Sequence, residues 1–447
     1  MSRYAAQRLP VHRGPAAWNV ILGEQDDPQR LEADTTADIT IIGAGFAGLA
    51  AARRCRQLQE NAKVVVLEAG RIAEGAAGRN SGFMIDLPHE LTSHDYAGAG
   101  DDRQQIALNR HAITFARQAV NEYGIDANFF DETGKVNGAA SSAADARNRS
   151  YAAHLDRLGE TSEYLDAQAM QQMTGSRHYH SGLYTPGTVM LQPAGFIRGL
   201  AAGLRRDENI AVYENSAVLN IEKHGQRWAV ITGNGRVSSS KVILAVNGHL
   251  ESFGIETGRL MQIFLFASMT QELDAANISK LGGTPRWGIT PSDPMGTTLR
   301  RIDTAQGGNR IVTRTCAVMR PDMQVSRAEV EKARRVHRRK FNDRFPALSG
   351  ITMEHCWAGH LCLTLNGVSV ARELDNGVFS ACAQNGLGTT RGILTGIAAA
   401  DMAYGARSEI ADHFAREGPP KPLPPQPFAK WGANGWMRFK EWQARAE

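Results

Sequence analysis

The stretch that decides the fold is DITIIGAGFAGLA, residues 38–50. A short apolar run, 38–42, leads directly into a Gly-x-Gly-x-x-Gly sequence, and an alanine-rich helical pattern follows over 46–58. A second apolar run, 63–68, ends at Glu68, twenty residues after Gly48. A strand, a glycine turn, a helix and a second strand in this order are typical of a dinucleotide-binding βαβ unit. We therefore predict an α/β protein with a Rossmann-like domain.

Each residue of this unit has a physical role. Gly43 permits the tight turn, Gly45 lets the backbone approach a pyrophosphate, and Gly48 lets the helix pack close to the strand. The N-terminus of the helix presents unpaired N–H groups and a partial positive charge to phosphate. Glu68 is placed to accept hydrogen bonds from both ribose hydroxyls, and it would repel a 2′-phosphate. The site therefore disfavours NADP.

Composition excludes several other classes of protein. The chain has 447 residues, enough for two or three domains, and its 45 glycines exceed the usual share of roughly 7%. A net charge of +4 is too balanced to indicate a nucleic-acid partner. We find no apolar run long enough for a transmembrane segment and no secretory signal. The cysteines are odd in number without a Cys-x-x-Cys pair, which favours free thiols, a reduced compartment and a cytoplasmic location.

The segment after Glu68 carries a family resemblance. It reads Gly-Ala-Ala-Gly-Arg-Asn-Ser-Gly over residues 75–82. This resembles the Gly-Ala-Ser-Gly-Arg-Asn-x-Gly sequence of the FAD-dependent amine and amino-acid oxidases, a family typified by D-amino acid oxidase, glycine oxidase and sarcosine oxidase. The likeness is strongest to the gamma-glutamylputrescine oxidase-type enzymes. Ala77 departs from the pattern, where the family has a serine that can contact phosphate.

Later segments extend the resemblance over roughly residues 15–405. They are 192–195, 217–218, 242–248, 357–359 and 384–388. The resemblance implies FAD as cofactor. The cofactor-binding candidates are Gly43, Gly45, Phe46, Ala47, Gly48, Glu68, Ala69, Gly75, Ala76, Gly78, Arg79, Asn80, Ser81, Gly82, Val218, Ala245, Asn247, Gly248, Gly386, Leu387, Gly388 and Thr389.

The second glycine patch, 386–389, precedes a helical pattern over 390–404. We expect Thr389 or Thr390 to cap this helix, and the loop to face the pyrimidine edge of the flavin, where donors stabilise the reduced state. An alternative reading is a second dinucleotide site for a nicotinamide, although the spacing departs from Gly-x-Gly-x-x-Gly. Some family members bind FAD through a cysteine, and Gly359 stands where we would align that thiol, so we predict non-covalent FAD.

The resemblance implies oxidation of a C–N bond. Hydride passes from the carbon to flavin N5, and the imine product hydrolyses in water. Arg300 and Arg314 lie in two strands of an expected hairpin, 297–303 and 310–315, where a guanidinium could clamp an anionic group of the substrate. With His360 and Asn385 they are the catalytic candidates. We expect no metal site.

We predict a discontinuous FAD-binding domain (37–100, 181–250 and 355–408) and a substrate domain of α+β type with an antiparallel sheet (101–180 and 251–354). An N-terminal arm (1–36) and a Pro-rich tail (409–447) flank them. For residues 1–14, a disordered tail fits the sequence as well as an ordered arm does. We also expect one helical pattern over 143–173 and a strand with one exposed face over 262–270.

The expected function is oxidation of an amine or an N-alkyl amino acid. We expect that this substrate also carries an anionic group. Oxygen or another acceptor would reoxidise the flavin. Two alternatives stay open. One is a flavin dehydrogenase that passes electrons to a quinone or a partner protein. The other is a non-catalytic FAD-binding protein. An oligomer is possible.

Overall fold

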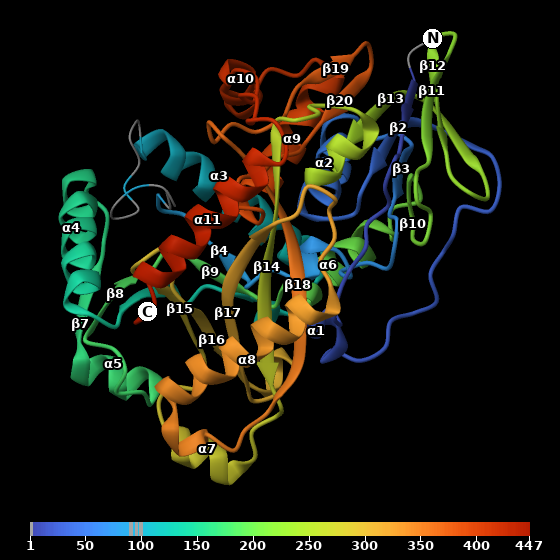
Figure 1. Cartoon of the computed structure of the whole chain (residues 1–447). Coiled ribbons are helices and arrows are strands. Elements are labelled where there is room, and N and C mark those ends of the chain that lie inside the picture. Colours follow the sequence, from blue (N-terminus) through green and yellow to red (C-terminus); the bar gives the residue numbers. More distant parts are fainter. Residues whose placement is uncertain (1–2, 89–92, 94–96, 98–101) are drawn as a thin grey trace.

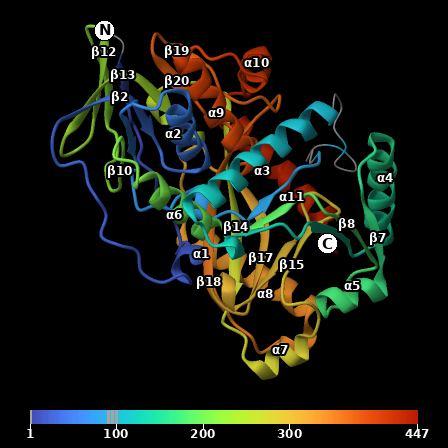
Figure 2. The same cartoon turned by 180° about the vertical axis from the view of Figure 1, so that it is seen from behind.

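Two large sheets organise the protein in the computed structural model, which describes residues 3–88, 93, 97 and 102–447 (Figures 1 and 2). In the nine-stranded sheet, β10, β3, β2 and β13 run parallel, and the end of β13 also pairs in parallel with β20. An antiparallel extension leads from β13 through β12 and β11 to β1. The strands are β1 (Arg3–Ala5), β2 (Thr35–Ile42), β3 (Val64–Leu67), β10 (Ile210–Tyr213), β11 (Asn220–His224), β12 (Arg227–Ile231), β13 (Arg236–Leu244), β19 (Glu373–Asp375) and β20 (Val378–Ser380).

The parallel strands are buried because helices cover them. Every residue of β3 is buried, as expected for a parallel strand with both faces covered. Helix α2 (Phe46–Leu58) packs against α9 (Thr390–Tyr404), and α3 (Asp102–Tyr123) packs against α6 (Pro193–Leu204) and α9. A Cβ atom at Gly396 of α9 would collide with the carbonyl oxygen of Ala47. The α2–α9 contact therefore depends on a helix surface without a side chain.

The eight-stranded sheet is mostly antiparallel and has the order β18–β14–β17–β16–β15–β6–β8–β7. Its strands are β6 (Lys135–Ala139), β7 (Glu163–Asp166), β8 (Ser181–Thr185), β14 (Leu260–Thr270), β15 (Trp287–Pro291), β16 (Thr298–Ile302), β17 (Arg310–Met319) and β18 (Met353–Thr364). The expected hairpin of 297–303 and 310–315 is confirmed, since β16 and β17 pair antiparallel. A small third sheet consists of β4 (Phe83–Met84), β5 (Phe130–Asp131) and β9 (Val189–Leu191).

Three expectations about single elements are wrong. The strand over 262–270 has no exposed face, because Phe264 packs toward α8 (Arg327–Arg344) and Ile263 toward α11 (Phe428–Gln443). The helical pattern over 143–173 is interrupted. Helix α4 (Ser142–Leu158) ends at Gly159 in the left-handed region, and β7 precedes α5 (Ala167–Thr174). The tail is not only Pro-rich, since α10 (Glu409–Arg416) and α11 lie in it.

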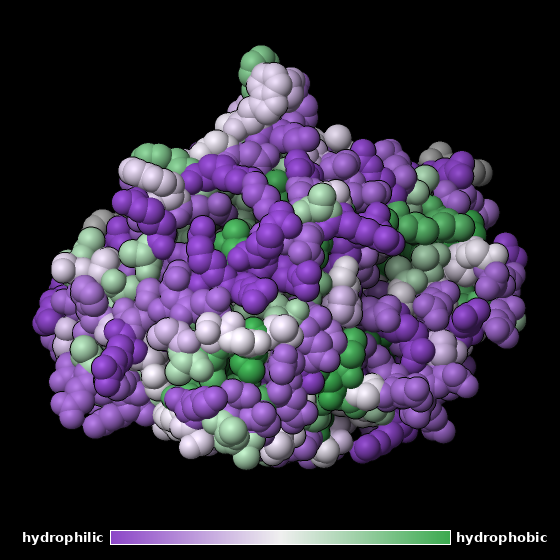
Figure 3. Space-filling model, turned by 60° about the horizontal axis from the view of Figure 1, so that its bottom comes forward, coloured by the Kyte–Doolittle hydropathy of each residue, from purple (hydrophilic) through white to green (hydrophobic). Residues whose placement is uncertain are grey.

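The N-terminal arm is ordered over its described part, so the disordered-tail alternative is wrong for residues 3–14. Strand β1 pairs with β11, and α1 (Ala17–Val20) carries Trp18, which is fully buried. Helix α7 (Ala275–Leu281) lies beyond the far end of the second sheet (Figure 1). The face turned forward in Figure 3 is largely hydrophilic with small hydrophobic groups, and none of the described helices is long and apolar enough to cross a membrane.

The predicted α/β class with a Rossmann-like unit is confirmed. The domain boundaries stay a prediction, and sheet membership refines the proposal. Strand β8 lies within the predicted range 181–250 and β18 overlaps the range 355–408, yet both strands belong to the second sheet. We therefore propose that β8 and β18 count with the substrate domain.

The α2–α9 contact gives a direct test of packing. We expect Gly396→Ala to lower the melting temperature by several degrees, because its methyl group must displace the backbone of α2. The matched control is Gly432→Ala in α11, where an added Cβ meets nothing within 4 Å. That change should leave stability unchanged or raise it by about 0.5–1 kcal/mol. Equal melting temperatures for the two variants would contradict the proposed close contact.

Candidate active site

A cavity lies where the two large sheets meet. Its empty space, part of it open to solvent, amounts to about 2070 Å³. Ile42 and Leu67, the last residues of β2 and β3, line one end. Leu265 of β14, Thr290 of β15 and Arg314 of β17 line the other. The cavity therefore joins the carboxyl ends of the parallel strands to the second sheet, the usual ligand position in such folds.

The first glycine motif forms the narrow turn as expected. Gly43 has φ +102°, and a Cβ atom there would lie 2.6 Å from the carbonyl oxygen of Ala245. A Cβ at Gly48 would collide with the carbonyl oxygen of Gly43. Gly48 does not line the cavity, so its role is helix packing. Gly45, at the N-cap of α2, does line it, and an added Cβ would meet only Ala77, at 3.6 Å.

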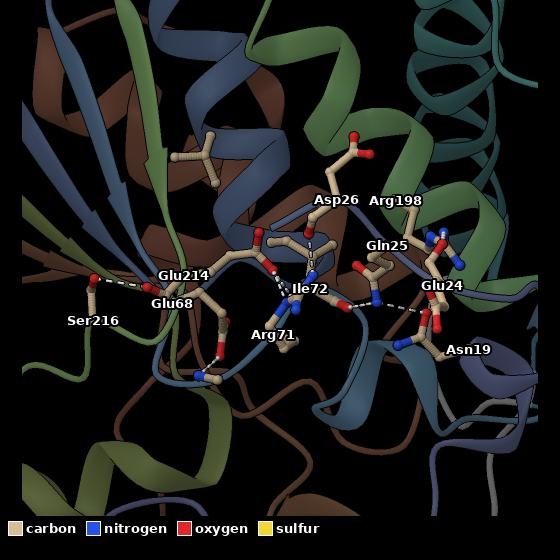
Figure 4. Close-up of polar contacts among 12 residues, drawn as sticks. Asn19, Glu24, Gln25, Asp26, Glu68, Arg71, Ile72, Arg198, Glu214 and Ser216 are labelled. Carbon is tan, nitrogen blue, oxygen red and sulfur yellow. Dashed lines mark hydrogen bonds and ion pairs between the residues drawn. The ribbon is translucent and has the colours of Figure 1, made fainter. Parts of the chain in front are cut away.

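Glu68 lies in the cavity wall at the end of β3 (Figure 4). Its Oε2 accepts a hydrogen bond from the Ala44 N–H at 2.9 Å, and its Oε1 accepts one from the Gly70 N–H at 3.1 Å. Burial raises the pKa of Glu68, and these N–H donors oppose the shift. The two bonds fix the orientation of the Glu68 carboxylate in the cavity wall.

A second carboxylate, Glu214, supports the loop after β3 (Figure 4). It is almost fully buried, accepts from the Ile72 N–H at 2.7 Å and pairs with Arg71 and Arg205. Gln25 of the N-terminal arm donates to the Ile72 carbonyl at 3.3 Å. The arm therefore fixes the loop that carries the family-like segment.

Arg79 is one of the cofactor-binding candidates, and its guanidinium holds several chain segments together. It donates to the carbonyl oxygens of Glu74, Arg13, Gly14 and Ala358 at 2.6–3.2 Å. Burial lowers the pKa of Arg79 to about 10. Arg79 lines the cavity, but these bonds tie three chain segments together behind it.

The next residues are held in the same way. Trp18 of the arm donates its indole N–H to the Asn80 carbonyl at 2.8 Å. The Asn80 side chain donates to the Ala77 carbonyl and accepts from the Gly82 N–H. Asn80 and Ser81 line the cavity, whereas Gly82 lies against the Arg300 guanidinium.

The second glycine patch, 386–389, lines the cavity and leads into α9. Gly386 and Gly388 line the cavity, and an added Cβ at Gly388 would meet nothing within 4 Å. Thr389 lines it too, but the expected side-chain cap is absent: the Thr389 hydroxyl donates to the Phe83 carbonyl at 2.8 Å, and α9 has no side-chain cap bond. Both glycine patches line one cavity, which disfavours a separate nicotinamide site.

His360, in β18, lines the end of the cavity formed by the second sheet. Gln262 donates its amide N–H groups to the Glu251 carboxylate at 2.7 Å and to the Gly248 carbonyl at 3.2 Å, so its Oε1 is left to accept. The 2.9 Å contact between that oxygen and His360 Nε2 therefore requires a proton on Nε2. The opposite ring nitrogen, Nδ1, is the acceptor of the neutral histidine.

Two further histidines line the cavity beside His360. The His249 ring lies edge-on to His360 with centroids 5.3 Å apart, and His12 comes from the arm. Burial lowers the pKa of His12 and of His249 to about 4, and it lowers the pKa of His360 well below its usual value. All three are therefore neutral at pH 7. No group of at least three histidine, cysteine or acidic side chains in the described part of the chain is arranged to hold a metal ion.

Only one of the two arginine candidates reaches the cavity. Arg314 lines it beside Ala267 and Thr290. Arg300 is fully buried outside it, donates to the Leu191 carbonyl and to Gln306 Oε1 at 3.2 Å, and lies over the Trp18 ring. Asn385 does not line the cavity either. Its side chain bonds the backbone of Thr364 and of neighbouring loop residues.

The remaining cofactor-binding candidates fall into two groups, those that line the cavity and those that do not. Those that line the cavity are Phe46, Ala47, Ala69, Gly75, Ala76, Val218, Ala245, Asn247 and Leu387, and those that do not are Gly78 and Gly248. A Cβ at Gly78 would collide with the Ala73 carbonyl oxygen, and one at Gly248 would collide with the Gln262 side chain. Sequence reasoning missed the arm residues Ala6, Arg8, Leu9, Pro10 and His12, which also line it.

Comparison with known proteins identifies the family. A family model described as FAD dependent oxidoreductase matches residues 38–402. The chain belongs to this family. It is 25% identical to the probable oxidoreductase OrdL of Rhizobium meliloti, over 90% of this chain and 91% of that protein. It is 26% identical to the gamma-glutamylputrescine oxidoreductase of Escherichia coli, over 89% of each. The fold is similar to that of glycine oxidase from Geobacillus kaustophilus, with a TM-score of 0.67, 16% identity and coverage of 84% and 96%.

FAD is therefore the cofactor, and the cavity fits it. Gly45, Gly75 and Gly388 leave open space along the wall where a side chain would intrude. The Asn247 Oδ1, which has no hydrogen-bond partner among the described residues, is buried at the same wall. As an oxidoreductase, the chain is an enzyme, so the alternative of a non-catalytic FAD-binding protein is set aside.

The neutral histidines make stability depend on pH. The pKa of His249 in the folded chain is about 4, below its ordinary 6.5, so the unfolded chain takes up the proton first as pH falls. We expect the free energy of unfolding to decrease from pH 6.5 to 4, by at most about 1.4 kcal/mol per pH unit for one histidine. In the His249→Gln variant, the free energy of unfolding measured with urea should decrease less steeply as the pH falls from 6.5 to 4. The exposed His224→Gln is the control, and an unchanged slope in His249→Gln would contradict the burial argument.

Proposed function

We propose that this enzyme oxidises the C–N bond of an amine or an N-alkyl amino acid that carries an anionic group. The observation that supports this is that one cavity contains two kinds of binding group. A dinucleotide-type wall with Glu68 lies at one end, and Arg314 with the neutral His360 lies at the other. The relatives named as gamma-glutamylputrescine oxidoreductase and glycine oxidase act on compounds of this kind, as their names state.

His360 would prepare the substrate. An amine arrives at neutral pH as an ammonium ion, which holds its nitrogen lone pair in an N–H bond. The His360 Nδ1 is an available acceptor because Gln262 fixes the proton on Nε2. Burial lowers the pKa of His360, so the ring is too weak a base to take that proton; the substrate gives it to water on entry, and Nδ1 accepts a hydrogen bond from the neutral amine, whose lone pair assists cleavage of the adjacent C–H bond. FAD, when bound, supplies the two-electron acceptor, and the released imine is hydrolysed by water to a carbonyl compound and an amine.

Arg314 would set the position of the substrate. A guanidinium binds a carboxylate with two parallel hydrogen bonds, which fixes orientation as well as distance. Arg314 stands in β17 next to a bulge, because Leu265 pairs with Ala317 and Phe266 with Thr315 while Cys316 is left unpaired. Bulges of this kind re-aim side chains near active sites.

The non-covalent binding of FAD also stays a proposal. Burial raises the pKa of Cys362, which lines the cavity, well above its usual value, so the thiol is a poor nucleophile.

Anaerobic flavin bleaching across amines, amino acids and polyamine conjugates tests the function. We expect bleaching by substrates with a carboxylate, and Arg314→Gln should raise the concentration for half-bleaching by roughly 10- to 100-fold for these substrates only. Amides of the same substrates are the control and should be unaffected. Bleaching by no amine would refute the proposal. Peroxide formation on re-aeration separates an oxidase from a dehydrogenase.

Glu68 gives an independent test of the cofactor position. Glu68→Gln should raise the dissociation constant of FAD by about 10- to 100-fold, since a charge-assisted hydrogen bond to ribose is lost. Titration of the apoprotein with FAD, followed by protein fluorescence, measures this. Glu74→Gln, an exposed carboxylate of the neighbouring loop, should bind FAD as the unchanged chain does. Equal affinity for the two variants would contradict the assigned role.

A further inference from the structure

Helix α11 presents an aromatic face to solvent. Its five large aromatic side chains are 48–65% exposed: Phe428, Trp431, Trp436, Phe439 and Trp442. At 3.6 residues per turn they fall within one sector of the helix. Gly432 and Gly435 lie in the same sector, and an added Cβ at either would meet nothing within 4 Å. A contiguous exposed apolar patch of this kind indicates a binding surface.

The opposite face of α11 holds the helix in place. Ala429 and Met437 are buried in a cluster with the second sheet. The Asn434 Oδ1 accepts from the Met319 N–H at 2.9 Å, and the Glu441 Oε1 accepts from the Ala317 N–H at 2.7 Å. These bonds satisfy backbone donors of β17. The helix therefore cannot rotate to bury its aromatic face, and the exposure is a fixed feature of the fold.

Positive charge borders the aromatic face. Arg445 lies over the Trp442 ring at 4.7 Å, and Lys440 lies 6.0 Å from the Trp436 ring. Arg438 and Arg445 also line a hollow of about 830 Å³ between α11 and α8, to which α8 contributes Lys332 and Arg339. Across the described residues, no ion pair joins these five cations to a carboxylate. Three carboxylates, Glu329, Glu441 and Glu447, line the same hollow against five cations, because Lys340 lines it too, so positive charge is in excess there. Glu441, the acidic residue of α11, accepts from the Ala317 N–H of β17.

We propose that α11 docks the enzyme on the surface of an anionic phospholipid bilayer. Tryptophan and phenylalanine with lysine and arginine at their edge suit the boundary between head groups and acyl chains. The cations of the hollow would meet lipid phosphates. In this docking mode the helix would lie in the plane of the surface with its aromatic face toward the acyl chains. A second copy of the chain is the weaker occupant, since a symmetric contact would bring the same cations together without an exposed carboxylate of α11 to oppose them.

Flotation of the FAD-loaded enzyme with vesicles tests this surface. We expect binding to vesicles that contain phosphatidylglycerol, weak binding to pure phosphatidylcholine, and release at about 1 M salt, where the screening length is roughly 3 Å. Arg438→Gln with Arg445→Gln should weaken binding about fivefold per charge removed. The matched control, Arg177→Gln with Arg206→Gln, removes two exposed cations outside α8 and α11 and should bind as the unchanged enzyme.

The aromatic contribution is measured separately. Trp431→Ser with Trp442→Ser should reduce vesicle binding roughly tenfold or more, while flavin absorbance and amine oxidation in solution stay unchanged. The control is Leu365→Ser, an exposed apolar residue in the turn after β18. Equal binding to neutral and anionic vesicles, or no binding, would overturn the proposal. So would a dimer in sedimentation equilibrium that dissociates in the double tryptophan variant, because a second copy would then cover the face.

Discussion

The close approach of α2 to the end of β2 is the contact on which the rest of the site depends. It exists because Gly48 has no side chain to meet the carbonyl oxygen of Gly43. The N-terminus of α2 therefore opens directly into the cavity. On its other side α2 packs against α9, again through a glycine, Gly396. The two helices whose leading loops line the cavity are thus fixed to one another, and the loops cannot separate without disrupting the core.

The substrate end depends on a different principle, the joining of distant segments by buried polar groups. Arg79 binds carbonyl oxygens of the arm and of β18, and Trp18 binds the carbonyl of Asn80. Buried donors of this kind cost free energy if they lose their partners, so each bond restrains the segments that it connects. The arm is consequently part of the cavity wall, and His12 comes to lie near His360.

Local patterns predicted the parts of the site that are adjacent in sequence. The spacing of Gly43, Gly48 and Glu68 predicted the dinucleotide-binding unit, because those residues act within one βαβ unit. Prediction was weaker where a residue's task depends on partners far away. Arg300 and Arg314 have the same chemistry and lie in neighbouring strands, yet Arg300 is buried against the Leu191 carbonyl and only Arg314 lines the cavity. The packing of the small third sheet decides this difference, and hairpin periodicity does not contain it.

The sequence by itself determined the α/β class, the dinucleotide-binding turn and the family resemblance, since glycine spacing and apolar runs are local consequences of backbone sterics. The tertiary structure alone decided which candidates share one cavity. It placed His12 of the arm beside His249 and made the histidines neutral by burial. It also turned the aromatic side of α11 outward, because the small and polar residues of that helix, Ala429 and Asn434 among them, are the ones that fit against β17. Burial and long-range contacts are properties of the whole packed chain, and no short stretch of sequence encodes them.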